Sequence, residues 1–520
     1  MTRAVFAAAI AVIVLAAFTA AEASVRVEGG WVEGTAVNGL MVYRGIPFAA
    51  PPVGDLRWRP PQPVKSWDGV LKADGYAPAC PQVQFSIPLF STGQTSEDCL
   101  YLNVWTPARS QQESLPVMVW IYGGGFAMGS TSVPFYNGRE LAGRGVIVVS
   151  IAYRVGPLGF LTHPELTAES ERKVSGNYGL LDQIAGLQWV QRNIKAFGGD
   201  PHCVTIFGES AGGMSVSMLA ASPLAKGLFH RAICQSGGSF GPIRRANETE
   251  GMQLLADAEA KGVEFAKRMG AESLAQLRKV SPDQWQKDPA AQMGGFWPVV
   301  DGYVIVDDQY KLYEVGKYND VPVLIGTNAD EGSMFARPTS PELYEKNIRE
   351  RFGPFSDRVL DLYPGKTQDQ TFRGAADLFR DVVFAWPTWS WARLQSKTGT
   401  SPVFVYFFEQ KQSQSLLAMF LKSDGASHGS EISYVFRHIY QGASEDDKRL
   451  SETMAAYWTN FAKHGNPNGE GLPQWPVFND REPTVLHLQS EPYVGPVPNR
   501  DKLTVIDEFQ TWRRAAESRP

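Results

Sequence analysis

Residues 207–213 read Phe-Gly-Glu-Ser-Ala-Gly-Gly and place Ser210 at the centre of a G-x-S-x-G pattern. The apolar run at 204–207 predicts a strand before this serine, and residues 214–219 predict a helix after it. Two glycines suit a sharp turn that holds the serine hydroxyl exposed at the end of the strand. The pattern therefore indicates a nucleophile that needs a base to take its proton. A plain glycine-rich turn is the alternative, and the flanking strand and helix argue against it.

A second glycine cluster, Gly123-Gly-Gly-Phe, directly follows the predicted strand 117–122. Backbone N–H groups of Gly124 and Gly125, together with that of Ala211, are expected to form an oxyanion hole with three donors. The competing interpretation is a dinucleotide-binding loop. We reject it because the glycine spacing is one residue out of register with that fingerprint and the residues that follow do not open a helix.

The base and its orienting acid should follow the serine in the chain order Ser, acid, His. That order excludes His163 and His202, and it leaves His230, His428, His438, His464 and His487. Four of these five lie next to or within predicted helices and strands, where packed or surface histidines are common. His428 instead lies in Gly-Ala-Ser-His-Gly-Ser, a loop of small residues after the predicted strand 403–408, and is the expected base.

The acid is expected directly after the predicted strand 323–327, where the chain reads Asp330-Glu331-Gly332. A carboxylate there would lie at the same carboxyl edge of the sheet as Ser210. Asp301 is better explained as a turn residue. The pattern does not choose between the two adjacent acids.

Apolar runs rich in Val and Ile recur along the chain, at 117–121, 146–151, 204–207, 323–325 and 403–408. Continuous apolar strands of this kind are covered on both faces, and helical patterns lie between them. The sequence therefore predicts an α/β fold with a mostly parallel central sheet and helices on both sides. Aromatic and Pro-rich stretches at 285–298 and 379–391 are expected to be helical insertions over the sheet and active site, and nothing marks an internal domain boundary.

The N-terminal residues resemble an export signal. Arg3 precedes an uncharged, mostly apolar run at 4–21, and small residues offer a cleavage site before Ser24. We expect residues 1–23 to be a signal peptide and 24–520 to be one mature domain, secreted or periplasmic. A retained membrane anchor is the alternative, although the apolar run is short for a span and no later segment is long enough.

The composition excludes several classes of protein. Among 520 residues, 43% are hydrophobic and 20% charged, which argues against wholesale disorder. A net charge of -5 without basic runs argues against nucleic-acid binding. The histidine and cysteine spacing shows no metal-binding pattern, so we expect neither metal nor cofactor. Cys80 and Cys99 flank a loop that suits a disulfide in an oxidising compartment, whereas Cys203 and Cys234 are expected to be buried thiols.

With these residues assembled, the sequence resembles the carboxylesterase/cholinesterase branch of the α/β-hydrolases, the type-B carboxylesterases. The resemblance covers almost the whole chain after residue 23. It is carried by Tyr43-Arg-Gly-Ile-Pro-Phe-Ala, Pro51-Pro-Val-Gly, Ser96-Glu-Asp-Cys-Leu-Tyr-Leu-Asn, Gly123-Gly-Gly-Phe, Asn177-Tyr-Gly-Leu-Leu-Asp-Gln, Phe197-Gly-Gly-Asp-Pro and Gly208-Glu-Ser-Ala-Gly-Gly.

This resemblance implies a serine carboxylesterase that hydrolyses small-molecule carboxylic esters through an acyl-enzyme on Ser210. It implies that Glu331, not Asp330, is the acid, that His428 is the base, and that Cys80 pairs with Cys99. It also implies supporting roles for Glu209 and Glu431, and for Ser236 beside the acid.

Departures from the family pattern narrow the expected substrate. Cholinesterases carry a tryptophan in the first disulfide loop, but between Cys80 and Cys99 this chain has only Phe85 and Phe90, which disfavours a choline ester. Residues 292–297, Gln-Met-Gly-Gly-Phe-Trp, resemble the acyl-pocket segment, and the two glycines suggest room for a bulky acyl group. A lipase or a hydrolase of a specialised natural ester, amide or carbamate would share these residues. A non-catalytic, cholinesterase-like adhesion protein is the alternative outside the class, and the sequence carries no signal of oligomeric state.

Overall fold

The computed structural model describes residues 24–83, 92–244, 251–411, 425–440 and 442–517. Its central feature is a sheet of 11 strands in the order β16-β15-β14-β13-β10-β9-β7-β8-β6-β4-β3. The bounds are β3 Thr35–Val37, β4 Leu40–Pro47, β6 Tyr101–Thr106, β7 Leu115–Ile121, β8 Ile147–Ile151, β9 Gly199–Glu209, β10 Arg231–Gln235, β13 Val323–Asn328, β14 Val403–Phe408, β15 Thr484–Leu488 and β16 Tyr493–Pro496.

The seven strands from β8 to β15 are parallel, and the strands at both edges run antiparallel. Every residue of β8, β13 and β14 is buried. This agrees with the continuous apolar runs in the sequence, which predicted strands covered on both faces. A separate small sheet of β1 (Ser24–Val27), β2 (Gly30–Glu33) and β5 (Val70–Lys72) contacts β4 of the large one.

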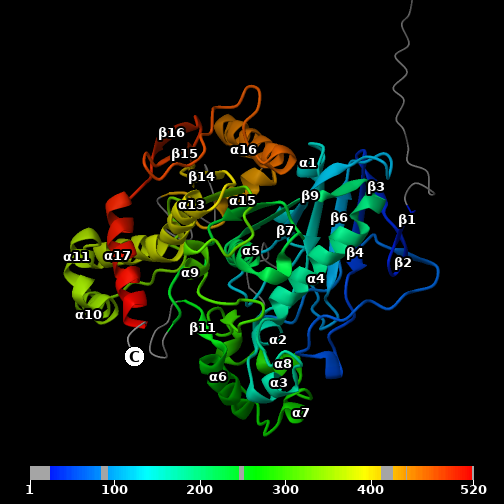
Figure 1. Cartoon of the computed structure of the whole chain (residues 1–520), viewed down its shortest axis with the longest axis horizontal. Coiled ribbons are helices and arrows are strands. Elements are labelled where there is room, and N and C mark those ends of the chain that lie inside the picture. The colour runs from blue at the N-terminus through cyan, green and yellow to red at the C-terminus, as the bar shows by residue number, and fades with distance from the viewer. Residues whose placement is uncertain (1–23, 84–91, 245–250, 412–424, 441, 518–520) are drawn as a thin grey trace, which may run out of the picture.

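Helices cover both faces of the large sheet (Figure 1). Helices α4 (Tyr178–Asn193), α5 (Ala211–Ala221) and α13 (Trp386–Thr398) pack on one face. On the other face α1 (Arg139–Ala142) and α16 (Glu445–His464) lie together, joined by an ion pair between Arg144, just after α1, and Glu452. The predicted mostly parallel sheet with helices on both sides is therefore confirmed.

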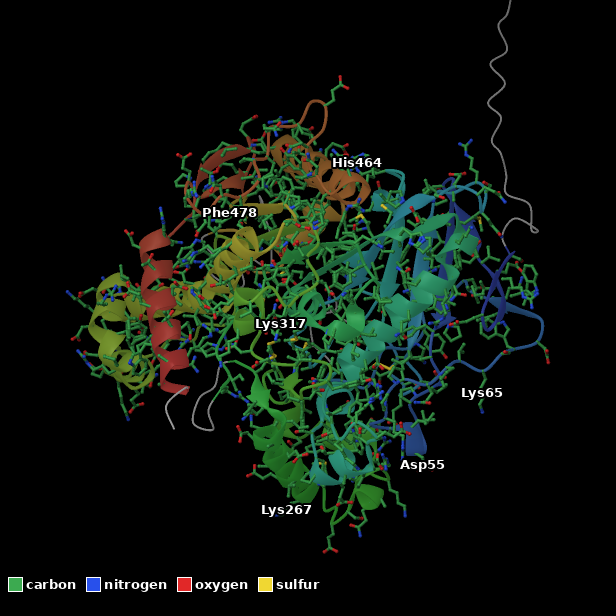
Figure 2. All side chains as sticks on the ribbon, in the orientation of Figure 1. Asp55, Lys65, Lys267, Lys317, His464 and Phe478 are labelled. Atoms are coloured by element: carbon green, nitrogen blue, oxygen red, sulfur yellow. A yellow bond between two sulfur atoms is a disulfide. The ribbon has the colours of Figure 1, made fainter. Side chains whose placement is uncertain are left out.

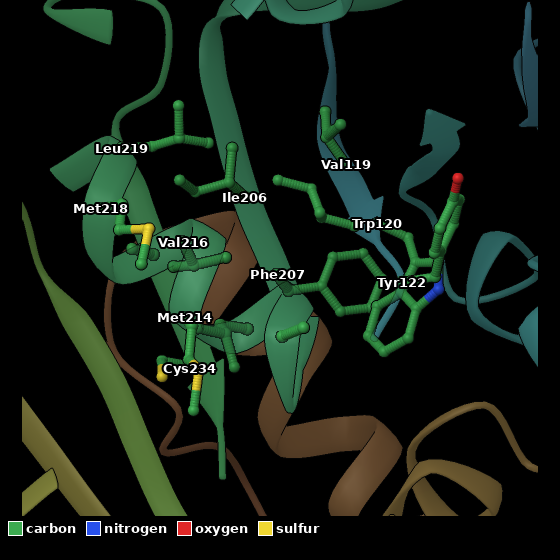
Figure 3. Close-up of a cluster of buried hydrophobic side chains, with 14 of the residues drawn as sticks. Val119, Trp120, Tyr122, Ile206, Phe207, Met214, Val216, Met218, Leu219 and Cys234 are labelled. Atoms are coloured by element: carbon green, nitrogen blue, oxygen red, sulfur yellow. The ribbon is translucent and has the colours of Figure 1, made fainter. Parts of the chain in front are cut away.

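Buried apolar side chains of β7, β9 and α5 pack together in the core (Figure 3). Trp120 and Phe207 lie on neighbouring strands with ring centroids 4.9 Å apart, and neither is exposed to solvent. Full burial of one such ring contributes about 1.5–3 kcal/mol to stability. Exposed charged side chains such as Asp55, Lys65 and Lys267 lie at the outline of the molecule (Figure 2). The buried, closely packed side chains at the centre of the sheet support the loops at its edge.

Two long helical insertions leave the sheet after β10 and after β13. The first holds α6 (Leu255–Arg268), α7 (Leu274–Leu277), α8 (Pro282–Trp285) and α9 (Gln309–Glu314); the second holds α10 (Pro341–Phe352), α11 (Ser356–Leu362) and α12 (Gln368–Arg380) before α13. Helix α15 (Ser430–Val435) precedes α16, and α17 (Arg500–Glu517) ends the chain beside α10 and α11 (Figure 1). None of the helices in the described ranges combines the length and apolar character that a membrane span needs.

Candidate active site

Ser210 lies in a tight turn between β9 and α5, as the motif predicts. It is the N-cap of α5 and has a φ of 56°, which is unusual for a residue with a side chain. Its N–H donates to the carbonyl of Gln235 at 2.9 Å, which ties the turn to the next strand. A Cβ on Gly212 would lie 2.0 Å from the carbonyl oxygen of Ile121. Glycine is required there because backbone from β7 crowds the turn, and the crowding stabilises the strained serine.

The glycine turn after β7 lies directly against Ser210. A Cβ on Gly123 would come within 3.0 Å of the Ser210 Cβ. Gly124 and Gly125 have φ values of 110° and 61°, so both adopt backbone conformations that favour glycine. Within the described ranges, the N–H groups of these two glycines and of Ala211 have no recorded acceptor. Ala211 is the first residue of α5, where an N–H has no partner inside the helix.

Glu331 follows β13 and receives three hydrogen bonds although it is fully buried. Its Oε1 accepts from Ser236 Oγ at 2.5 Å and from the N–H of Asn328 at 2.6 Å. Its Oε2 lies 2.5 Å from His428 Nδ1. Because two of these hydrogen bonds hold Oε1 in place, Oε2 has a fixed position from which Glu331 can orient an imidazole.

Asp330 points elsewhere. Its Oδ1 accepts from Ser333 Oγ at 2.5 Å, and its Oδ2 lies 3.8 Å from Arg373. Of the two carboxylates that the strand-end pattern left open, the structure thus brings Glu331 to His428.

The loops that carry Glu331 and His428 are joined to each other. Asp330 and Ser427 form a parallel bridge, in which the N–H of Asp330 donates to the carbonyl of Ala426 at 2.9 Å. Asn328 Nδ2 donates to the carbonyl of Ser427 at 2.9 Å and to Glu431 Oε2 at 2.5 Å. The two loops therefore keep one relative position, which keeps the carboxylate aligned with the ring.

Glu431 supports the same arrangement from the start of α15. Its Oε1 accepts from Gln235 Nε2 at 3.1 Å, and Gln235 Oε1 accepts from Trp458 Nε1 at 3.0 Å. The sequence gives no signal for Asn328, Gln235 or Trp458, because no local pattern marks a polar side chain whose partners lie on other strands and helices.

Three buried carboxylates surround His428. Its Nε2 lies 3.2 Å from Glu209 Oε1, on the side of the ring that faces away from Glu331. Burial lowers the pKa of His428, but the charges of Glu209 and Glu331 outweigh burial and raise that pKa above its ordinary value. Burial is the main cause that raises the pKa of Glu209 and of Glu431, and repulsion from the neighbouring carboxylates raises both further. The cluster therefore favours a positive imidazole, the charge that a general base acquires when it takes a proton.

The other histidines after Ser210 lie outside this cluster. His230 Nδ1 accepts from the N–H of Val204, and His487 contacts Glu409 and the carbonyl of Pro496. His464 ends α16, and His438 lies three residues beyond the end of α15, not within a helical pattern. No three His, Cys, Asp or Glu side chains of the described residues form a group suited to a metal ion.

Cys80 and Cys99 form a disulfide with a Cα–Cα distance of 5.1 Å. Cys234 is a buried thiol, whereas Cys203 is half-buried and accepts from Arg231 Nη1 at 3.0 Å. Asp301 is the predicted turn residue, because its Oδ1 accepts from the N–H groups of three following residues. Residues 1–23, Phe85 and Phe90 lie outside the described residues.

The segment at 292–297 covers the glycine turn differently from what its glycines suggest. The side chain of Met293 lies over Gly125, where an added Cβ would meet its Cγ at 2.5 Å. A Cβ on Gly295 would lie 1.9 Å from the carbonyl oxygen of Ala290, so this glycine is needed by the local turn itself. The side chain of Met293, more than the two glycines of this segment, therefore limits the space beside the turn at Gly125.

A search of family models matches residues 21–505 to the carboxylesterase family. The chain belongs to this family. The carboxylesterase is 39% identical to fumonisin B1 esterase of Sphingopyxis macrogoltabida, over 87% of this chain and 84% of that protein. It is 37% identical to para-nitrobenzyl esterase of Bacillus subtilis (strain 168), over 92% of this chain and 97% of that protein. It is also 35% identical to cocaine esterase of Homo sapiens, over 92% and 87% of the two chains.

A solved structure of PNB esterase shares the fold of the carboxylesterase with a TM-score of 0.80. The two are 34% identical, and the alignment covers 93% of this chain and 100% of that one. The carboxylesterase therefore has the α/β-hydrolase fold, and it is a hydrolase of carboxylic esters.

Proposed function

We propose that the protein is a serine carboxylesterase in which Ser210 is the nucleophile, His428 the base and Glu331 the acid. The observation that carries this proposal is the 2.5 Å contact between His428 Nδ1 and Glu331 Oε2, in a cluster that includes Glu209, the residue directly before Ser210. Glu331 fixes the ring with its proton on Nδ1, so the lone pair of Nε2, which lies 3.2 Å from Glu209 Oε1 in this structure, is the one that accepts a proton from the serine hydroxyl. The N–H groups of Gly124, Gly125 and Ala211 serve as the oxyanion hole.

The reaction proceeds in two halves. His428 Nε2 takes the hydroxyl proton while Ser210 Oγ bonds to the ester carbonyl carbon, and the carbonyl oxygen becomes an oxyanion bound by the three N–H groups. The bond to the alcohol oxygen then breaks, and His428 returns the proton to that oxygen. Water repeats the sequence on the acyl-enzyme, which releases the acid and restores the serine. Glu331 orients the imidazole throughout, Ser236 and Glu431 support the hydrogen-bonded arrangement of the acid and its loop, and Glu209 favours the imidazolium.

We further propose that residues 1–23 direct export and that 24–520 form one mature domain, secreted or periplasmic. The apolar leader and the disulfide between Cys80 and Cys99 support export, because such bonds persist in oxidising compartments. Strands from residue 35 to residue 496 enter one sheet, which supports a single domain.

The substrate we propose is a small-molecule carboxylic ester other than a choline ester. Relatives of similar identity are named for fumonisin B1, para-nitrobenzyl and cocaine esters, so likeness to them does not select one compound. The loop between Cys80 and Cys99 has no tryptophan to bind a quaternary ammonium group. Rates over a matrix of acyl and alcohol groups, with choline esters included, measure this preference.

Replacement of Ser210 by alanine tests the proposed function. Ser210→Ala should keep the wild-type unfolding temperature and lose at least ~10⁴-fold in turnover of a p-nitrophenyl ester. A fluorophosphonate should label the wild-type protein at Ser210 and leave the variant unlabelled. Undiminished hydrolysis by Ser210→Ala would exclude the serine mechanism, and absence of both hydrolysis and labelling in the wild type would favour a non-catalytic adhesion protein.

A further inference from the structure

The imidazole of His428 lies against two phenylalanine rings. Phe384 stacks on it with ring centroids 4.7 Å apart and planes inclined by 28°. Phe335 meets it edge-on, with centroids 5.3 Å apart and planes inclined by 65°. Phe384 is 2% exposed and Phe335 is half-buried. A hydrogen bond at Nδ1 fixes one atom of the ring, whereas contacts on the ring faces fix its plane and hence the direction of Nε2.

Phe384 is held by an irregular piece of helix. The segment η8, Asp381–Ala385, is π-helical and lies between α12 and α13. The N–H of Trp386 donates to the carbonyl of Asp381, five residues earlier. Pro387 follows and has no N–H to donate to the carbonyl four residues before it, which interrupts the regular α-helical ladder. A π turn inserts one residue and turns the side chains around it to new directions, and such turns are frequent at functional sites.

A buried polar network fixes this turn relative to the acid loop. Arg380 donates to both oxygens of Asp381, at 2.7 and 3.0 Å, and its Nη1 donates to the carbonyl of Ala329 at 3.1 Å. Tyr363 donates its hydroxyl to Asp381 at 2.9 Å. Ala329 lies two residues before Glu331. One guanidinium therefore holds the turn that carries Phe384 and the backbone that leads into the carboxylate on the same imidazole.

We propose that Phe384 is a positioning residue for His428, aided by Phe335, and that the π turn exists to place its ring. This inference rests on the proposed Ser-His-Glu function and adds a constraint on the plane of the base. The stacked ring fixes the plane of the imidazole and hence the direction of Nε2, and its π face stabilises the imidazolium that forms when Ser210 loses its proton.

Single substitutions separate this role from simple packing. Phe384→Leu removes the ring, Phe384→Tyr retains it, and Phe379→Leu is the matched control. Phe379 stacks on Phe335 at 4.7 Å and contacts Phe384 at 6.0 Å, and it has no recorded ring contact with His428. The acylation rate constant is measured from the pre-steady-state burst with a p-nitrophenyl ester, and the unfolding temperature is measured for each variant.

Loss of the ring should slow acylation about ten-fold, the order of effect expected for an aromatic contact to a buried cation, with little change in substrate affinity. The acid limb of the kcat/KM profile should move to lower pH, because an imidazolium without its aromatic neighbour loses its proton more readily. The charged groups that raise the pKa of His428 are Glu209, Glu331 and Glu431, and all three remain in each variant. Phe384→Tyr should restore both properties, and Phe379→Leu should leave both unchanged.

Two results would overturn the inference. The first is that Phe384→Leu acylates at the wild-type rate. The second is that Phe379→Leu slows acylation as much as Phe384→Leu does, while Phe384→Tyr does not restore the wild-type rate. Should Phe384→Leu not fold, Phe335→Leu at the half-buried ring gives the second test, since an unchanged rate and pH profile there contradict the proposal. His428→Ala keeps the two hypotheses apart. If His428→Ala is fully active, the proposed function is wrong. If His428→Ala is inactive and Phe384→Leu is fully active, only the role of the aromatic ring is wrong.

Discussion

Replacement of Glu331 by glutamine probes the alignment of the base more directly than any other single change. The wild-type carboxylate accepts from Ser236 Oγ at 2.5 Å and from the N–H of Asn328 at 2.6 Å, and it faces His428 Nδ1 at 2.5 Å. Glutamine has one oxygen to accept and one NH₂ group that only donates. Since two fixed donors demand the oxygen, the NH₂ group must face Nδ1.

An NH₂ group beside Nδ1 forces that nitrogen to accept, which places the ring proton on Nε2. An Nε2 that already carries a proton cannot take another from Ser210. Loss of the correct tautomer in a Ser-His-acid site lowers kcat by about 10⁴-fold, equivalent to about 5.4 kcal/mol at 1.36 kcal/mol per decade. The change leaves shape and volume nearly constant, so the fold should survive.

Steady-state ester hydrolysis and thermal unfolding of Glu331→Gln provide the assay. Asp330→Asn is the matched control, because its carboxylate is adjacent in sequence and contacts Ser333 and Arg373, away from the ring. Near-normal activity in Asp330→Asn is expected. A Glu331→Gln enzyme with near wild-type turnover, or a loss confined to Asp330→Asn, would refute the assignment of the acid.

Two further predictions concern pH. Glu209→Gln removes a charge 3.2 Å from His428 Nε2 that raises the pKa of the base, so the acid limb of kcat/KM should move to lower pH in the variant, and an unmoved limb in the pH profile contradicts this. His487 faces acceptors with both ring nitrogens, Glu409 at 2.9 Å and the Pro496 carbonyl at 3.0 Å, which together raise its pKa in the folded protein despite burial. Its contribution to stability should be complete below the unfolded-state pKa of about 6.5 and should be lost as pH rises through the higher folded-state pKa. The difference in unfolding temperature between wild type and His487→Gln should therefore shrink as pH rises above about 6.5, and a difference that does not change with pH would count against this role.

Local patterns were sufficient to predict the parallel centre of the sheet and the strained serine, but not the antiparallel strands at its edges. The apolar run at 403–408 matches β14 residue for residue, and that at 117–121 lies within β7. The turn at Ser210 was predictable because its strand, glycines and helix are consecutive in the chain. His428 could be chosen because a loop of small residues after a strand contrasts with the surroundings of the other histidines.

Residues whose importance depends on distant partners were not predictable in this way. Spacing alone left Asp330 and Glu331 equivalent; the family resemblance favoured Glu331, and its contact with His428 Nδ1 shows that this carboxylate faces the imidazole. Asn328 ends a buried strand and reads as an ordinary strand residue, yet it joins three site elements. The stretch at 379–391 was expected to be an insertion, and it contains the π-helical segment at Asp381–Ala385. That segment was not predictable, because an irregular turn within a continuous helical pattern has no sequence period of its own.

The arrangement of strands also determines when activity first appears as the polypeptide is made. In the proposed mechanism the nucleophile and the oxyanion turn directly follow β9 and β7, but the imidazole of His428 follows β14, more than two hundred residues after Ser210. A chain that has emerged only as far as β13 would carry an exposed serine in its elbow with nothing to activate it. Newly synthesised protein should therefore stay inert toward esters in the compartment of its synthesis until the last third of the chain has joined the sheet.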